Sequence, residues 1–143
     1  MSSLSLSFAS TLENVNLVRG VVSGVCREYL PHASRDACGD CNLCLAVVEA
    51  LNNVVKYAGS KKIDMELAVS SREIVLRIFS EGKKFDPTSD VVERSEDPSG
   101  AMPEGGYGLT IIRSTVDELK YQYREGKNVL TLTKKMMPCN MEG

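Results

Sequence analysis

The sequence predicts an α+β domain of two layers, in which helices cover one face of a mixed, mainly antiparallel sheet. Segments with strand-like alternation and segments with helical apolar spacing follow one another in the order strand, helix, helix, strand, strand, helix, strand, strand. Most strands are joined by connections short enough for hairpins, which make neighbouring strands antiparallel. The chain has 143 residues, of which 43% are apolar and 25% charged, and these values are typical of one globular domain.

Composition and charge argue against several classes of protein. The 17 basic and 19 acidic residues give a formal net charge of −2, which is unlike a protein that binds nucleic acid by neutralising phosphates. The longest apolar runs are too short to span a bilayer, and the first residues lack the basic and apolar regions of a signal peptide. We therefore expect a cytoplasmic protein that contacts neither nucleic acid nor membrane, and whose five cysteines stay reduced.

The N-terminal segments predict a strand followed by a long helix. Apolar residues alternate with serines over residues 4–8, which is the period of a half-buried strand. Ser10 or Thr11 can cap a helix that runs over residues 12–30 with apolar residues at helical spacing. Pro31 ends this helix because proline cannot continue it.

A second helix is predicted over residues 41–58, and Gly59 supplies its stop. Two strands follow at residues 63–70 and 74–80, joined closely enough for a hairpin. The apolar face of the second helix is expected at Leu45, Val48, Leu51 or Asn52, Val55 and Ala58.

The C-terminal half starts with a change in composition. Residues 81–104 contain seven acidic and three basic residues and three prolines, which predicts a lid or an irregular excursion at about residues 83–105. A glycine-rich stretch then leads into a helix over residues 109–119. Two strands at residues 121–124 and 128–133 close the domain.

Glu49 and Asn53 are the first candidates for a functional site. They lie four residues apart on the second helix and therefore share one face. A carboxylate and an amide on a helix that otherwise carries valine and leucine are hard to explain by packing. The alternative is that both simply face solvent.

Two glycine-containing segments are further candidates. Gly106 and Gly108 stand at the start of a predicted helix, where backbone N–H groups and the helix dipole favour an anion. The alternative there is an ordinary tight turn. Residues 80–87 follow a strand and, taken alone, predict only a turn.

Taken in order, these segments resemble one superfamily of ATP-binding proteins, the gyrase and histidine-kinase type (GHKL). Residues 45–58 resemble its N-box, residues 80–87 its first glycine box and residues 105–113 its second. Residues 116–135 resemble the end of the anti-sigma regulatory factors that are serine-protein kinases. The resemblance covers nearly the whole chain in the same order and spacing.

The resemblance implies a single histidine kinase-like ATPase domain over residues 1–143, with an ATP–Mg²⁺ site between the sheet, the helices and the lid. Glu49 corresponds to the general base of the family, and Asn53 to its Mg²⁺ ligand. A carboxylate can take the proton of an attacking hydroxyl, and an amide oxygen suits a hard cation. The other positions implied for nucleotide binding are Lys56, Ser80, Gly82, Gly106 and Gly108.

The resemblance also implies partners. Members of this family bind a sigma factor, or phosphorylate an anti-sigma factor antagonist on serine or threonine, in partner-switching regulation of transcription. We therefore expect a serine/threonine-protein kinase of the anti-sigma type. A homodimer is a further expectation from the family.

Two features leave other functions open. The family's first glycine box begins with an aspartate that reads the adenine amino group, and this chain has Ser80 there and Lys84 at the second glycine. A partner-binding module that binds little or no nucleotide is therefore the alternative. Cys38, Cys41 and Cys44 have the spacing of three iron–sulfur ligands, which adds a thiol or metal sensor as another. The alternative for these three cysteines is that they are simply small side chains, buried or half-exposed, without such a function.

Overall fold

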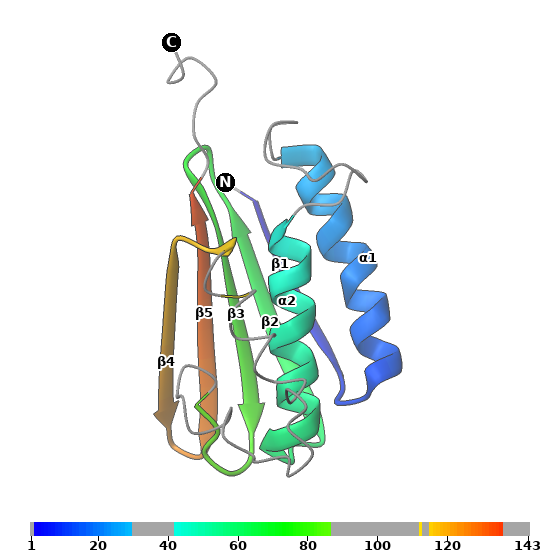
Figure 1. The fold of residues 1–143 in the computed structure, drawn as a ribbon, viewed down its shortest axis with the longest axis vertical. Coiled ribbons are helices and arrows are strands. Elements are labelled where there is room, and N and C mark those ends of the chain that lie inside the picture. The colour runs from blue at the N-terminus through cyan, green and yellow to red at the C-terminus, as the bar shows by residue number, and fades with distance from the viewer. Residues whose placement is uncertain (1, 30–41, 87–111, 113–114, 136–143) are drawn as a thin grey trace, which may run out of the picture.

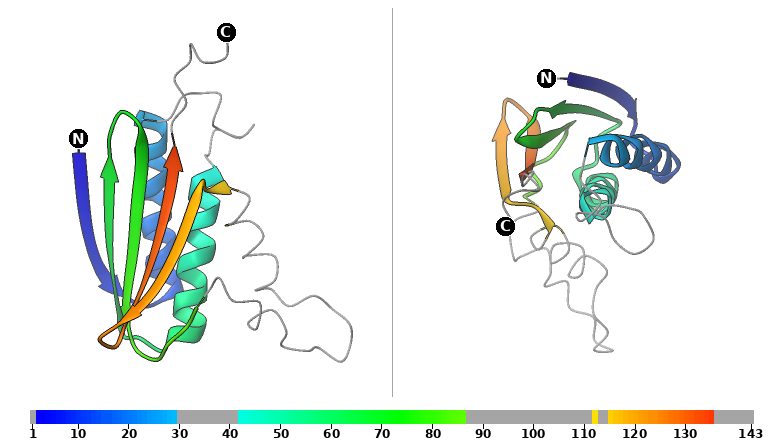
Figure 2. Two further views of the ribbon diagram at one scale, coloured as in Figure 1. Left: turned by 90° about the vertical axis from the view of Figure 1, so that its left-hand side faces the viewer. Right: turned by 90° about the horizontal axis from the view of Figure 1, so that it is seen from above.

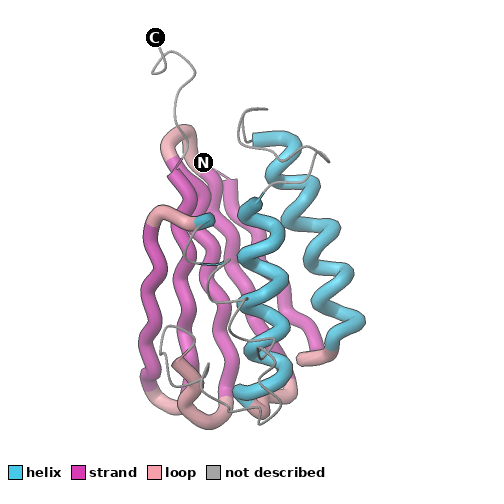
Figure 3. Tube along the Cα trace, viewed as in Figure 1, coloured by secondary structure: helices cyan, strands magenta, loops and turns pink. Residues whose placement is uncertain are grey.

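The computed structural model describes residues 2–29, 42–86, 112 and 115–135. In these residues, two helices lie on one side of a five-stranded sheet (Figures 1 and 2). In chain order the elements are β1 (Ser2–Ala9), α1 (Leu12–Tyr29), α2 (Asn42–Asn53), the π-helical turn η2 (Val54–Ala58), β2 (Lys62–Val69), β3 (Glu73–Glu81), β4 (Glu118–Arg124) and β5 (Lys127–Lys135). Figure 3 separates the strand layer from the helical layer by colour. The predicted two-layer α+β fold is confirmed.

The strands lie in the order β1-β2-β3-β5-β4, and all four pairings are antiparallel. Alternate residues of β2 and β3 are buried, so one face of the sheet packs on the helices and the other stays open. Ser80 on β3 faces Ile63 on β2 and Asn128 on β5. Because directly paired residues share a face, these three side chains lie on the helical side.

The core lies between the sheet and both helices. Apolar residues of α1, α2, η2 and the central strands are buried in one cluster. The first strand and helix occur as predicted, and Thr11 caps α1 because its Oγ1 accepts a hydrogen bond from the Asn14 N–H at 3.2 Å. Among the described residues, no helix has the length and apolarity needed to cross a membrane.

The second helix differs from its prediction in two ways. It changes after Asn53 from an α-helix to the π turn η2, and Gly59 ends it with a φ of 70°. The expected apolar face is partly wrong, because Leu45 is 42% exposed while Ala46, Val47 and Ala50 are fully buried. The buried stripe is therefore rotated around the helix relative to the one we expected.

The predicted helix over residues 109–119 ends too late. Glu118 and Leu119 belong to β4, where Leu119 pairs with Leu132 of β5. The Asp117 N–H donates to the Thr133 carbonyl oxygen at 2.8 Å, so sheet contacts already begin there. Pairing with β5 outweighs the helical spacing of a short apolar run. The part of the predicted lid at residues 87–105 lies outside the described residues, and the single domain over 1–143 stays a prediction.

Candidate functional site

Glu49 and Asn53 come from the last turns of α2. Asn53 is 6% exposed and Glu49 is half-buried, so the alternative that both simply face solvent is wrong. Within the described part of the chain, neither side chain makes a hydrogen bond or an ion pair. The Asn53 amide atoms are not among the fully enclosed polar atoms that lack a partner, so they keep some contact with solvent. Asn53 therefore has polar groups left for a ligand.

The π turn η2 directly follows Asn53. Turns of this kind are rare, and they occur frequently at functional sites. The Tyr57 ring on η2 lies 5.4 Å from the ring of Phe85, which connects η2 to the segment after β3. Lys56 on the same turn is exposed and already takes part in an interaction, and its implied contact with phosphate stays a prediction.

Ser80 lies on the inward face of β3, at its C-terminal end. The residue is 2% exposed, and its Oγ has no hydrogen-bond partner. Buried hydroxyl groups are normally paired, so an unpaired one points to a missing partner. Among the described side chains, only the hydroxyls of Ser10 and Ser60 share this condition.

Gly82 brings the backbone after β3 against the end of η2. Its φ is 148°, and a Cβ placed on it would lie 2.5 Å from the Ala58 carbonyl oxygen. No other residue type fits such a contact without movement of the backbone. The Gly82 N–H donates to the Gly126 carbonyl at 3.1 Å, and its carbonyl accepts from the Tyr123 hydroxyl at 2.8 Å.

Asn128 on β5 holds the segment after β3 in place, and sequence reasoning missed it. The residue is 4% exposed, and its Oδ1 accepts hydrogen bonds from the Phe85 N–H at 2.8 Å and from the Tyr121 hydroxyl. Its Nδ2 donates to the carbonyl oxygens of Lys83, at 3.0 Å, and Ser80, at 3.5 Å. The sequence did contain a signal for this role, because an asparagine stands at an inward-facing position of a strand whose residues alternate.

Tyr121 supports Asn128 from the edge strand β4. Burial raises the pKa of the Tyr121 hydroxyl, and the charge of Asp86 adds to this, while the Phe85 backbone acts in the opposite direction. A raised pKa keeps the hydroxyl protonated, as a donor to Asn128 must be. Residues 82–86 are thus tied to β4 and β5 by side chains from both strands.

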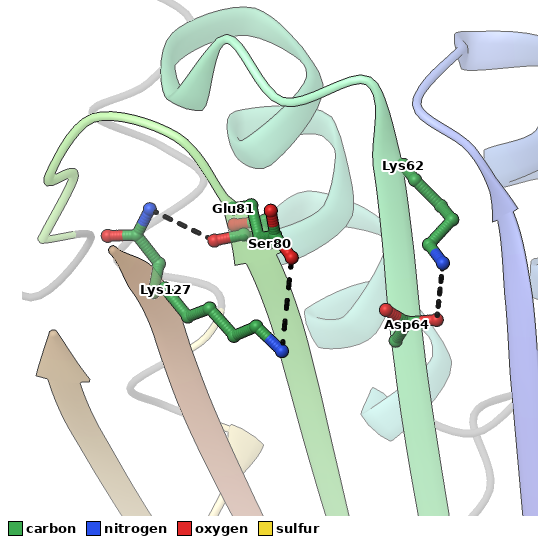
Figure 4. A network of polar contacts seen from close by, with 6 residues as sticks. Lys62, Asp64, Ser80, Glu81 and Lys127 are labelled. Carbon is green, nitrogen blue, oxygen red and sulfur yellow. Dashed lines mark hydrogen bonds and ion pairs between the residues drawn. The ribbon is translucent and has the colours of Figure 1, made fainter. Parts of the chain in front are cut away.

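The open face of the sheet has a hollow of its own. About 480 Å³ of space is lined by the start of β2, residues 59–61, Lys127 and the end of β3, with Ser80 and Gly82 among its lining residues. On that face Lys62 pairs with Asp64, and Lys127 with Glu81, both at 3.9 Å (Figure 4). These exposed pairs leave the hollow with mixed charge, and each contributes little to stability.

The remaining candidates are only partly covered. Gly106 and Gly108 lie outside the described residues, as do Cys38 and Cys41. Cys44 is a buried thiol that forms no disulfide, and its Sγ donates a hydrogen bond to the Arg19 carbonyl oxygen at 3.4 Å. Cys26 is 1% exposed and disulfide-bonded, so the expectation that the cysteines stay reduced is wrong for this one.

The part of the chain that the structure covers contains no group of three or more His, Cys, Asp or Glu that could hold a metal. Because Cys38 and Cys41 lie outside these residues, the iron–sulfur alternative stays untested. Mg²⁺ has other needs, because it takes one or two protein oxygens and completes its shell with water and phosphate. The unpaired Asn53 amide fits that donor set.

A half-covered antiparallel sheet with a polar site at the end of α2 is the arrangement that the sequence resemblance implied. The family model described as "Histidine kinase-like ATPase domain" matches residues 8–134. The chain therefore belongs to the histidine kinase-like ATPase (GHKL) family, and the sequence-based assignment is confirmed.

Named relatives agree with the anti-sigma branch of the family. The chain is 40% identical to the serine/threonine-protein kinase BtrW of Bordetella bronchiseptica over 103 residues, covering 67% of this chain and 70% of the relative. It is 23% identical to an anti-sigma F factor of a Thermoanaerobacter species over 130 residues, which cover 89% of this chain and 88% of that relative.

A solved structure confirms the fold. The RsbU and RsbW domains of Rv1364c from Mycobacterium tuberculosis match with a TM-score of 0.63 at 16% identity. The match covers 96% of this chain and 34% of that chain, so this chain spans about a third of its length. At this identity the likeness concerns the fold alone.

Proposed function

We propose that the protein is an anti-sigma-type serine/threonine-protein kinase that binds ATP with Mg²⁺ and phosphorylates a partner protein. The observation that carries this proposal is the pair Glu49 and Asn53, which share one helical face and have no partners among the described residues. Family membership and the 40% identity to a relative named as a serine/threonine-protein kinase support it. An anti-sigma factor antagonist is the substrate class we propose, and the cytoplasm the location.

Three residues have distinct tasks in this proposal. The Asn53 Oδ1 would hold Mg²⁺, which would neutralise phosphate charge when bound. The Glu49 carboxylate would accept the proton of the partner's serine or threonine hydroxyl as that oxygen bonds to the γ-phosphorus. The bond between this phosphorus and the bridging oxygen breaks, and ADP leaves. Gly82 would let the backbone pass close to the nucleotide.

Calorimetry of ATP binding, with and without Mg²⁺, tests the proposal on matched variants. We expect Mg²⁺-dependent binding that Asn53→Ala abolishes, because the amide that holds the cation is lost. Asn52→Ala changes the neighbouring asparagine of the same helix and should keep the binding. Glu49→Gln should also keep it, since the base acts in transfer.

Two results would contradict the kinase. Equal binding with and without Mg²⁺ would remove Asn53 from its role. No binding at millimolar ATP would favour the second candidate, a partner-binding module without nucleotide. The observation behind that candidate is Ser80, which stands where the family has an aspartate.

A further inference from the structure

The outward side of α2 around Leu45 is the feature that points beyond the pair Glu49 and Asn53. Leu45 is 42% exposed, although its helical spacing predicted a place in the core. It lies four residues before Glu49, so the two side chains are neighbours on one row of the helix. Val48 and Asn52 next to this row are only partly buried. We refer to Leu45, Val48, Glu49 and Asn52 as the outer face of α2 (Figure 1).

The outer face carries little charge. Glu49 is the one charged residue of α2 between Asn42 and Asn53, and the first and last turns of this helix have none. A single exposed leucine on a protein surface needs no explanation by itself. The position of Leu45 beside the proposed general base is what gives the exposed side chain a task.

The order of residues along α2 sets the direction from which a protein substrate reaches Glu49. In the proposed reaction, Asn53 lies toward the phosphates of the nucleotide, and Glu49 takes the proton of the acceptor hydroxyl. The attacking and leaving oxygens stand roughly in line on opposite sides of the γ-phosphorus, so the acceptor comes from the side away from ADP. Four residues of helix rise about 6 Å, and Leu45 lies one such step beyond Glu49 on that side.

We propose that Leu45 is a docking contact for the protein substrate, and that it selects an apolar residue next to the phosphorylated serine or threonine. Burial of Leu45 against an apolar side chain of the substrate is favourable. A charged side chain placed on Leu45 and Val48 would lose hydration without gaining an ion pair. This inference rests on the proposed kinase function and names the chemistry of its substrate.

A library of short peptides tests this contact on the full chain. Each peptide carries one serine or threonine, and the residues directly before and after it are varied. Transfer of label from radioactive ATP in the presence of Mg²⁺ is measured for each peptide. We expect leucine, isoleucine, valine or methionine next to the acceptor to raise kcat/KM about tenfold over aspartate, glutamate or lysine.

Two charged variants of Leu45 make the test sharper. Leu45→Asp should shift the preference toward lysine and arginine next to the acceptor, and Leu45→Arg toward aspartate and glutamate, each by about tenfold. Both variants should bind ATP as the wild type does, because Leu45 would contact the acceptor and not the nucleotide. The control is Leu17→Asp on α1, where the side chain is 70% exposed, and it should keep the wild-type preference.

Other results would overturn the inference. An unchanged peptide preference in both Leu45 variants would show that the acceptor does not contact this side chain. A wild-type preference for charged flanking residues would also overturn it, as would labelling of no peptide while Mg²⁺-dependent ATP binding persists, and both results would leave nucleotide binding intact. If ATP does not bind, the proposed function falls together with this inference.

Discussion

Gly82 is the residue at which the backbone after β3 and the end of η2 approach most closely. A Cβ there would lie 2.5 Å from the Ala58 carbonyl oxygen, which is backbone and cannot move aside cheaply. The positive φ of Gly82 adds a second reason why a side chain does not fit. The contact fixes where residues 82–86 leave the sheet, next to Ser80.

The variant Gly82→Ala should lower the free energy of unfolding by about 1–3 kcal/mol, because the backbone must shift to remove the clash. Denaturant unfolding measures this. The control is Gly20→Ala, since Gly20 lies in α1 with nothing within 4 Å of its added Cβ, and that variant should gain about 0.5–1 kcal/mol. Equal effects of the two substitutions would contradict the close contact.

Single residues differed in how well they could be predicted. Asn53 could be found from the sequence because four-residue spacing is a local property of a helix. Ser80 and Gly82 could be found because they fit a local sequence motif. The role of Asn128 could not be predicted, because it depends on contacts with Lys83 and Phe85, which are more than 40 residues away in the sequence. Such contacts exist only after β3 and β5 have paired.

The segment between β3 and residue 86 is held by β4 and β5 rather than by its own hydrogen bonds. Asn128 and Tyr123 bond to its backbone, and Tyr121 donates to Asn128. Since burial raises the pKa of Tyr121 in the folded protein, the folded protein keeps a proton that the unfolded chain releases first.

Stability should therefore fall at alkaline pH. The contribution of Tyr121 is fully present below its ordinary pKa of 10.0 and is lost as the pH rises through the higher folded value. Denaturant unfolding across this range should show a downward slope that Tyr121→Phe reduces. The control Tyr29→Phe, at an exposed position, should keep the slope of the wild type. An unchanged slope in Tyr121→Phe would contradict the link.

The elements themselves were predictable to different degrees. Strands β2 and β3 alternate between buried and less buried residues, and β5 does so over most of its length, so their positions could be read within one or two residues. The π turn η2 and the position of the buried apolar stripe on α2 could not be predicted, because packing against the sheet and α1 decides them. The early start of β4 was missed because Leu119 also fits helical spacing.

The molecule as a whole has two unlike faces. The helical face carries Glu49 and Asn53, while the open face carries the hollow with its lysines and acids, which Ser80 and Gly82 also line. The two-layer architecture could be predicted because alternation and helical spacing are sequence properties. The face that binds a ligand could not be predicted, because it depends on which side chains are left without partners once the core has assembled.

The most direct test is the NMR spectrum of the isotope-labelled protein titrated with ATP and Mg²⁺. The side-chain amide signals of Asn53 should shift with increasing ligand, because the proposed nucleotide site includes this amide on the helical face. Signals of Lys62, Asp64 and Lys127 should change little. Shifts confined to these open-face residues, or no shifts at millimolar ATP, would contradict a nucleotide site formed by α2 and the end of β3.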